Sequence, residues 1–175
     1  VRLLFERAVQ DGRIPGAVLL GGREAEIRFH EAYGFAQLIP CAEPMLNDTL
    51  FDIASLSKLV GTWPGILLLL QQGRLTLDTR LTDVLDGPWH PALKDVTVFQ
   101  LLTHTAGLRP GQHPEGFGST RRERVDGLKR LEPIYAPGTQ VMYSDLSFIF
   151  LGELLSELMG EPLDAAAARV WRAIG

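Results

Sequence analysis

The sequence predicts an α+β domain in which an N-terminal helix and two antiparallel strands precede a mainly helical body. The apolar run 16–22 and the partly alternating run that starts at Ile27 are typical of two strands joined by a short turn. Apolar residues then recur at helical spacing after Ser55 and again over 147–160. A two-stranded ribbon is marginally stable alone, so this hairpin is expected to need further strands.

The elements predicted along the chain are as follows. Residues 1–12 predict an amphipathic helix that Gly12 ends, the segment "GREAE" predicts the turn of the hairpin, and 37–49 read as a loop. Helices are expected over 55–72 with Gly73 as the C-terminal cap, over part of 76–87, from a Thr97 cap to Gly107, over 147–160, and over 162–175. The glycine- and proline-rich stretch 107–120 predicts a long loop, and 125–133 and 135–145 predict connecting turns.

Composition limits the class of protein. The 175 residues are 46% hydrophobic and 22% charged, which is typical of one soluble globular domain. A net charge of -4 with scattered arginines argues against a nucleic-acid partner. The single cysteine, Cys41, excludes an internal disulfide and a multi-cysteine zinc site. No signal peptide is visible and the apolar run 59–70 is too short to span a bilayer, so a cytoplasmic location without a membrane span is expected.

The stretch "FDIASLSKLV" raises the chemical question, because Ser55 precedes Lys58 by three residues. Serine is a favoured N-cap, and an S-x-x-K match alone is a weak motif. On a helix, however, residues three apart share a face, so the Lys58 amine can reach the Ser55 hydroxyl and act as its base. The apolar surroundings and the helix N-terminus both predict a Lys58 that is pushed toward its neutral form. Serine cap and activated nucleophile therefore stand as two interpretations of one pattern.

Five blocks in order resemble the serine β-lactamase and penicillin-binding-protein superfamily, especially its class C-like branch with the related esterases and D-amino-acid peptidases. They are "IPGAVLLGGREAEIRFHEAYGFA", "FDIASLSKLV", "GRLTLDTRLTDVL", "VTVFQLLTHTAGL" and "YAPGTQVMYSDLSFIFLGELL". S-x-x-K is a signature of such enzymes. The resemblance implies the β-lactamase/transpeptidase-like fold and a Ser55 acyl-enzyme, with the Ser55 N–H as half of an oxyanion hole.

The branch's second motif, Tyr-x-Asn, reads Tyr143-Ser144-Asp145 here. By resemblance, Tyr143 faces the nucleophile and shares the general-base role with Lys58. Asp145 departs from the motif, because an ionised aspartate accepts hydrogen bonds but cannot donate one to a substrate carbonyl as asparagine does. Asp145 is therefore expected to favour a protonated Lys58 and to repel anionic substrates, which shifts the prediction from β-lactams toward other esters or amides.

Histidines and cofactors have no predicted role in the chemistry. His104 in "LLTHTAGL" suggests a Ser-His-Asp triad, but no G-x-S-x-G elbow is present, and in the resembling family this block is a structural corner between helix and loop. A satisfied buried histidine is therefore expected. His30, His90 and His113 lack metal-ligand spacing, so no metal and no cofactor are expected.

The superfamily's third motif, Lys-Thr-Gly or a His-x-Gly variant on a later strand, has no convincing equivalent in the sequence. Residues 1–175 are therefore expected to be an incomplete domain, with a helix and hairpin over 1–36 and a helical region over 50–175. The resemblance implies that the remaining strands and one oxyanion donor lie elsewhere. The chain alone is expected to be inactive, and either to self-associate or to need a complementing C-terminal fragment.

The sequence thus predicts a β-lactamase-related serine hydrolase that acts on a small-molecule ester, amide or peptide, including β-lactams or D-amino-acid peptides. The catalytic residues are predicted to be Ser55, Lys58 and Tyr143, with Asp145 in a substrate-binding or secondary role. The alternative, prompted by Asp145 and by the missing third motif, is a non-catalytic relative that uses the fold for binding or assembly.

Overall fold

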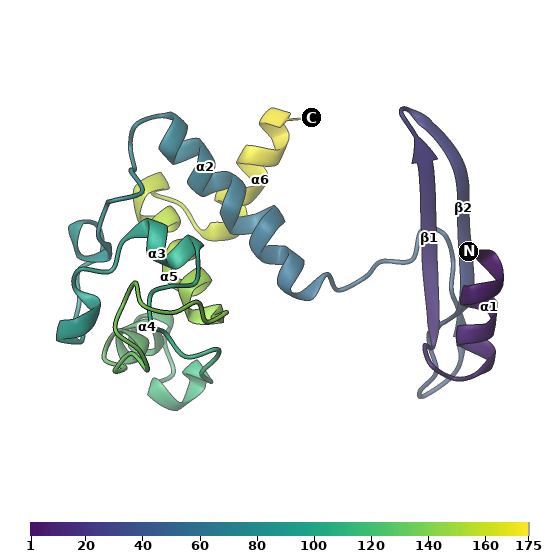
Figure 1. Cartoon of the computed structure of the whole chain (residues 1–175), viewed down its shortest axis with the longest axis horizontal. Helices are drawn as coiled ribbons and strands as arrows, with labels where there is room; N and C mark the ends of the chain where they lie inside the picture. Colours follow the sequence, from purple (N-terminus) through teal and green to yellow (C-terminus); the bar gives the residue numbers. More distant parts are fainter. Residues whose placement is uncertain (175) are drawn as a thin grey trace. The chain divides into compact units, whose positions relative to one another are not determined.

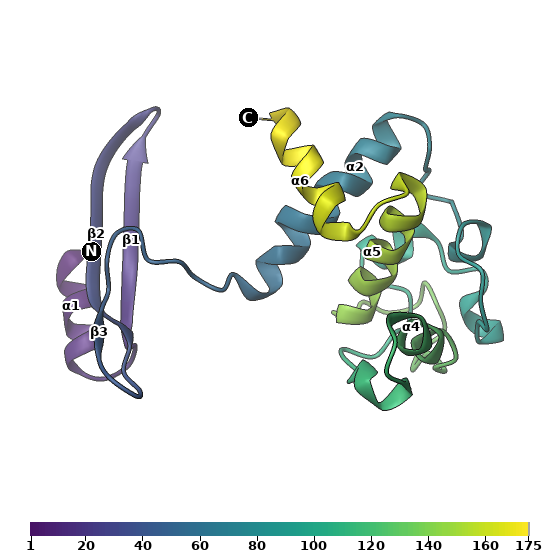
Figure 2. The ribbon, with the colours of Figure 1, turned by 180° about the vertical axis from the view of Figure 1, so that it is seen from behind.

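The computed structural model describes the backbone of residues 1–174 and the side chains of 1–172. The chain forms two compact units, Val1–Asp52 and the helical unit that begins at Ile53, and each is described by itself. Figures 1 and 2 show the elements of each unit from two sides. Among the described residues, no helix is long and apolar enough to cross a membrane.

The N-terminal unit holds the predicted helix and hairpin. Helix α1 (Arg2–Gln10) precedes strands β1 (Gly16–Arg23) and β2 (Glu26–Gln37), which pair antiparallel, and the short strand β3 (Glu43–Pro44) pairs with β2 at the opposite edge to β1. The α+β prediction is confirmed, and β3 adds one strand within the predicted loop.

Helix α1 packs on β2 through side chains of its first half and of the middle of the strand. The rings of Phe5 and Tyr33 stack with centroids 5.6 Å apart, and Arg2 and Tyr33 both donate hydrogen bonds to the carboxylate of Glu31. Met45 is the single buried side chain among residues 1–52. The unit therefore buries little apolar surface, as expected for a short sheet that is stable only with further packing.

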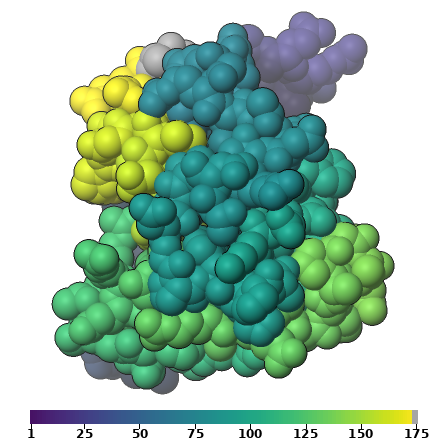
Figure 3. Space-filling model, turned by 90° about the vertical axis from the view of Figure 1, so that its left-hand side faces the viewer, coloured from purple at the N-terminus to yellow at the C-terminus, as the bar shows by residue number. Residues whose placement is uncertain are grey.

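The helical unit is built around α5 (Asp145–Met159), which lies at its centre in Figure 2. Helices α2 (Trp63–Gln71), α3 (Val98–Leu102) and α6 (Leu163–Ile174) pack against it. In the space-filling view of Figure 3, α2 and the yellow α6 lie side by side. The fully buried side chains of this core include Ile66, Leu69, Phe150, Leu151, Leu154 and Leu155. Each such side chain contributes about 1.5–3 kcal/mol of hydrophobic stabilisation, so the core fixes α2 and α5 relative to one another.

Gly65 brings α2 close to α5. A Cβ atom at this position would lie 2.5 Å from Cδ2 of Leu155, and Leu155 is fully buried and has no room to move aside. Glycine therefore permits the close approach. The approach holds the helix that follows Ser55 and Lys58 against the helix that follows Tyr143.

Several predicted elements differ in the structure. The segment 76–87 forms only the short 3-10 turn η3 (Leu81–Asp83), and the helix capped by Thr97 ends at Leu102 rather than at Gly107. The early end has a backbone cause, because His104 adopts a left-handed φ of 56° that a helix cannot continue through. The segment predicted as a connecting turn is largely α4 (Arg121–Lys129), and Gly175, predicted as the end of the last helix, lies outside the described residues.

Candidate active site

The nucleophile segment begins with irregular helical turns. Ser55 lies in the 3-10 turn η1 (Ala54–Leu56), and Lys58 opens the wider π-type turn η2 (Lys58–Thr62), so the regular helix predicted from Ser55 begins only at Trp63. Ala54 has a left-handed φ of 45°, a conformation that costs energy for a residue with a Cβ and is found preferentially at functional sites. The turns place the side chains of Ser55 and Lys58 on one face.

The Ser55 hydroxyl is bound to Lys58 and not to a helix end. Its Oγ accepts a hydrogen bond from Lys58 Nζ at 3.3 Å. Neither η1 nor η2 has a side-chain cap hydrogen bond, so the interpretation of Ser55 as a helix cap finds no support in the geometry. The S-x-x-K spacing therefore produces the serine–lysine contact that it predicts.

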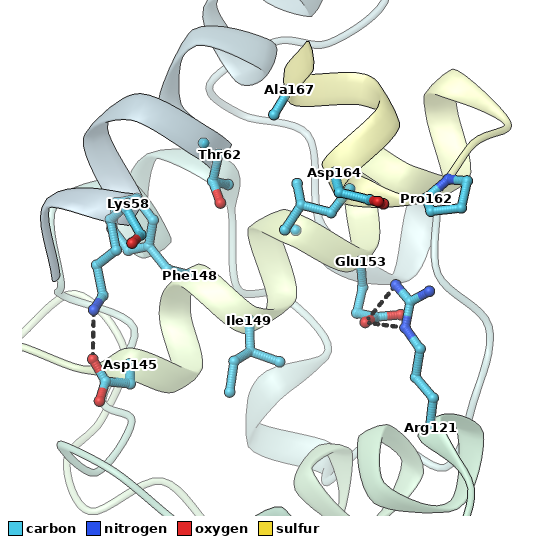
Figure 4. Close-up of a pocket in the computed structure, with 14 residues that line it drawn as sticks. Lys58, Thr62, Arg121, Asp145, Phe148, Ile149, Glu153, Pro162, Asp164 and Ala167 are labelled. Atoms are coloured by element: carbon cyan, nitrogen blue, oxygen red, sulfur yellow. Dashed lines mark hydrogen bonds and ion pairs between the residues drawn. The ribbon is translucent and has the colours of Figure 1, made fainter. Parts of the chain in front are cut away.

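Lys58 also contacts the start of α5. Its Nζ donates to Asp145 Oδ1 at 2.6 Å and lies 5.0 Å from the centre of the Tyr143 ring. Figure 4 shows this ion pair joining the two helices. The Lys58 side chain is only 16% exposed, against 56% for Asp145. Four side chains of the predicted site, Ser55, Lys58, Tyr143 and Asp145, are thus brought together.

The expectation that Lys58 is pushed toward neutrality is wrong. Burial does lower the pKa of Lys58, but hydrogen bonds to Asp145 and Tyr143 outweigh it and raise the pKa above its ordinary value. Lys58 is therefore an ammonium, as expected from the presence of Asp145.

Tyr143 has the opposite shift. Hydrogen bonds with Lys58, and next with Ser55, lower the pKa of the Tyr143 phenol, because the adjacent ammonium stabilises a phenolate. The Tyr143 side chain is 49% exposed and can be reached from solvent. Lys58 and Tyr143 therefore act as a pair. Lys58 keeps its proton, and the oxygen of the deprotonated Tyr143 is the atom of the pair that can accept a proton from Ser55.

Backbone carbonyls of the segment after α3 hold the start of α5. Ser144 Oγ donates to the carbonyl of Arg109 at 2.6 Å, and the Asp145 N–H donates to the carbonyl of Pro110 at 2.8 Å. Sequence reasoning missed these contacts because they are made by carbonyl groups, which carry no residue-specific signal. Gly107 carries a sequence signal for the packing of this segment, because a Cβ there would lie 2.2 Å from the carbonyl oxygen of Tyr135.

His104 is half-buried, and its Nδ1 accepts a hydrogen bond from the backbone N–H of Ser144 at 3.1 Å. The hydrogen bond satisfies the histidine as expected, but His104 is only partly buried. His90 caps the short turn η4 (Pro91–Leu93) by accepting from the Ala92 N–H. Within the described part of the chain, no group of three or more His, Cys, Asp or Glu side chains is arranged to hold a metal ion.

A largely apolar cavity of about 700 Å³ adjoins Lys58 and Asp145 inside the helical unit. Figure 4 shows Ile149 and Phe148 of α5 between this polar end and an ion pair of Arg121 with Glu153. The other residues that line the cavity include Thr62, Gly152, Pro162, Leu163 and Ala167. Of the predicted site residues, Lys58 and Asp145 line this cavity, whereas Ser55 and Tyr143 do not.

Comparisons with known proteins identify the family of the chain. The beta-lactamase family model matches residues 1–175. Esterase EstB of Burkholderia gladioli is 35% identical over 93% of this chain and 46% of its own length. The solved structure of EstCE1, described as a hydrolase with promiscuous acyltransferase activity, matches with a TM-score of 0.80 at 25% identity over 96% of this chain and 48% of that one. A beta-lactamase/D-alanine carboxypeptidase from Pseudomonas syringae matches with a TM-score of 0.75 at 31% identity over 97% and 47%.

The family model and the structural matches place the fold in the penicillin-binding-protein and β-lactamase superfamily, whose named relatives include esterases, β-lactamases and D-alanine carboxypeptidases. The chain belongs to the beta-lactamase family. The superfamily prediction is confirmed, whereas these similarities do not single out its class C-like branch. The chain spans less than half the length of the relatives just named.

Proposed function

We propose that the protein containing this chain hydrolyses esters through an acyl-enzyme formed on Ser55. The observation that carries the proposal is the position of Lys58 Nζ, which lies 3.3 Å from Ser55 Oγ and 2.6 Å from Asp145 Oδ1, with Tyr143 bound to the same ammonium. The nucleophile thus lies beside the ammonium that stabilises a Tyr143 phenolate, and that phenolate is the adjacent base that covalent catalysis requires. The 35% identity to a protein named an esterase supports the choice of ester.

We assign the proton transfers from the contacts of Ser55, Lys58 and Tyr143 together with the opposite directions of the pKa shifts of Lys58 and Tyr143. The Tyr143 phenolate oxygen takes the Ser55 proton while Ser55 Oγ forms a bond to the substrate carbonyl carbon, and the Ser55 N–H is one donor to the resulting oxyanion. The Tyr143 phenol then returns the proton to the leaving alcohol as the ester C–O bond breaks. In the second half, water gives a proton to Tyr143 and attacks the acyl carbon, and Ser55 leaves with that proton. Lys58 remains an ammonium throughout and stabilises the phenolate.

Covalent labelling tests this proposal. The full-length protein is treated with a fluorophosphonate probe, digested, and examined by mass spectrometry for the modified peptide. The expected adduct lies on Ser55, and a p-nitrophenyl ester present in excess should slow its formation. A protein that gives no adduct on Ser55 and hydrolyses no ester would contradict the proposal and favour the non-catalytic alternative.

Asp145 provides a prediction on pH dependence. Burial lowers the pKa of Lys58, but the hydrogen bond to the Asp145 carboxylate acts to raise it. The charge of Asp145 also acts to raise the pKa of Tyr143. An Asp145→Asn variant removes both effects, so the base pair should lose its proton at lower pH. Its acylation by a chromogenic cephalosporin should be faster than in the parent, and the rise of rate with pH should shift to lower pH.

The matched control for this variant is Asp78→Asn, which makes the same charge change at an exposed turn position and should leave the pH profile unchanged. Stopped-flow acylation rates across the pH range provide the measurement. A slower Asp145→Asn variant with an unshifted profile would show that the carboxylate assists the reaction directly.

A further inference from the structure

His104 makes three successive contacts with the segment that carries Tyr143. Its carbonyl oxygen accepts from the Met142 N–H at 2.8 Å, its ring lies 4.7 Å from the Tyr143 ring centre to centre, and its Nδ1 accepts from the Ser144 N–H at 3.1 Å. The other neighbour of the imidazole is Phe148 of α5, with ring centres 5.5 Å apart. One residue thus contacts the chain immediately before, at and immediately after Tyr143.

The backbone of His104 is held in an unusual conformation to make these contacts. Its φ of 56° lies in the left-handed region, which few residues other than glycine adopt and in which histidine, like asparagine and aspartate, is enriched. Such a conformation persists where surrounding contacts enforce it, and it is found preferentially at functional sites. The left-handed residue ends α3 and turns the imidazole toward Tyr143.

The contact with Ser144 defines the state of the imidazole. A ring nitrogen that accepts from a backbone N–H carries no proton itself, so His104 is the neutral tautomer with its proton on Nε2. Burial, and next the Lys58 ammonium, lower the pKa of His104, while Asp145 acts in the opposite direction. The titratable groups that influence or contact the imidazole are therefore Lys58 of η2, Tyr143 before α5, and Asp145 at its start.

We propose that His104 is a positioning residue for the reaction, whose neutral imidazole holds the Tyr143 phenol oxygen in place between Ser55 and Lys58. The inference rests on the proposed function, because it concerns the base of that reaction. His104 itself does not exchange protons with the substrate. Protonation of His104 replaces the acceptor at Nδ1 with an N–H that faces the N–H of Ser144. The segment that carries Tyr143 then loses its hydrogen bond to the imidazole.

Two variants separate the acceptor from the ring. His104→Asn keeps an acceptor oxygen near the position of Nδ1 and tolerates the left-handed backbone, whereas His104→Phe keeps the aromatic contacts and has no acceptor. In full-length protein, His104→Phe should acylate with a fluorophosphonate about tenfold to a hundredfold more slowly, the cost of a misplaced catalytic group. His104→Asn should retain a rate close to that of the parent.

The pH profile provides a measurement that a merely structural role would not change and that does not depend on a folded phenylalanine variant. In the parent, the logarithm of the acylation rate should fall with a slope of one as the base pair gains its proton. The slope should steepen to two below the pKa of His104, which lies under the ordinary 6.5. The His104→Asn variant should keep a slope of one.

The outcomes are distinguishable. A parent slope of one throughout, or equal rates for His104→Phe and His104→Asn with matching circular dichroism spectra, would overturn the positioning role while Ser55 labelling still stands. A parent that forms no adduct on Ser55 would overturn the proposed function, and the positioning role with it. Retained activity in His104→Asn, loss in His104→Phe and the change of slope in the parent alone would establish His104 as the residue that positions Tyr143.

Discussion

The Ser55→Ala variant of the full-length protein should lose ester turnover almost completely. The methyl side chain offers no oxygen to form the acyl-enzyme, and the Lys58–Tyr143 pair then has no proton to remove. A loss of about 10⁶-fold in kcat is expected, the size seen when a catalytic serine is removed from another serine hydrolase. Initial rates with a p-nitrophenyl ester, corrected for spontaneous hydrolysis, provide the measurement.

Ser57→Ala is the matched control for this experiment. Ser57 is exposed and lies two residues beyond Ser55 in the same segment, so its variant makes the same change of side chain close to the site. It should retain turnover. Equal activity of the two variants, or strong residual activity in Ser55→Ala, would show that another group forms the covalent intermediate.

The Tyr143→Phe variant should show the next largest effect. It keeps the ring, and with it the contacts to His104 and to the Lys58 ammonium, but it removes the oxygen that receives the Ser55 proton. Loss of a general base costs about 10²–10⁴-fold in rate. The base that remains is Lys58. Burial lowers its pKa, but the hydrogen bond to Asp145 still acts to raise it. The residual activity should therefore rise with pH only in a more alkaline range than in the parent.

The pH dependence of kcat/KM for the same ester, with Tyr135→Phe as the control, checks this prediction. Tyr135 is half-buried in the loop before the site. Its variant also loses a phenol hydroxyl, but at a position away from Ser55. A Tyr143→Phe variant with an unshifted profile and nearly full activity would assign the base role to Lys58 alone.

The predicted elements that the structure confirms share a strong local signal. The strand β1 follows from its apolar run and turn residues, α5 from its amphipathic spacing, and the start of α3 from Thr97, whose hydroxyl accepts from the Gln100 N–H. These signals involve neighbours a few residues apart. Local backbone preference and side-chain period therefore suffice to predict them.

The helix α4 shows a local signal that was present but not used. Thr120 and Glu123 form a capping box, in which each side chain binds the backbone N–H of the other. The pattern T-x-x-E at 120–123 is a sequence signal for this helix, and Gly127 lies in the segment 125–133 that was expected to be a connecting turn. Gly127 serves packing instead, because a Cβ there would lie 2.3 Å from the Phe117 side chain.

At the site, the sequence by itself determined the contact between Ser55 and Lys58, because a spacing of three residues in a helical turn places both side chains on one face. It also marked Tyr143 and Asp145 as candidates through a family resemblance. The sequence supported two opposing expectations for the charge of Lys58, and only the tertiary structure decided between them and fixed the position of Tyr143. The carboxylate that raises the pKa of Lys58 belongs to Asp145, 87 residues further along the chain, and the imidazole that contacts Tyr143 comes from yet another segment. Electrostatic and packing effects depend on distance in space, so local sequence could not predict them.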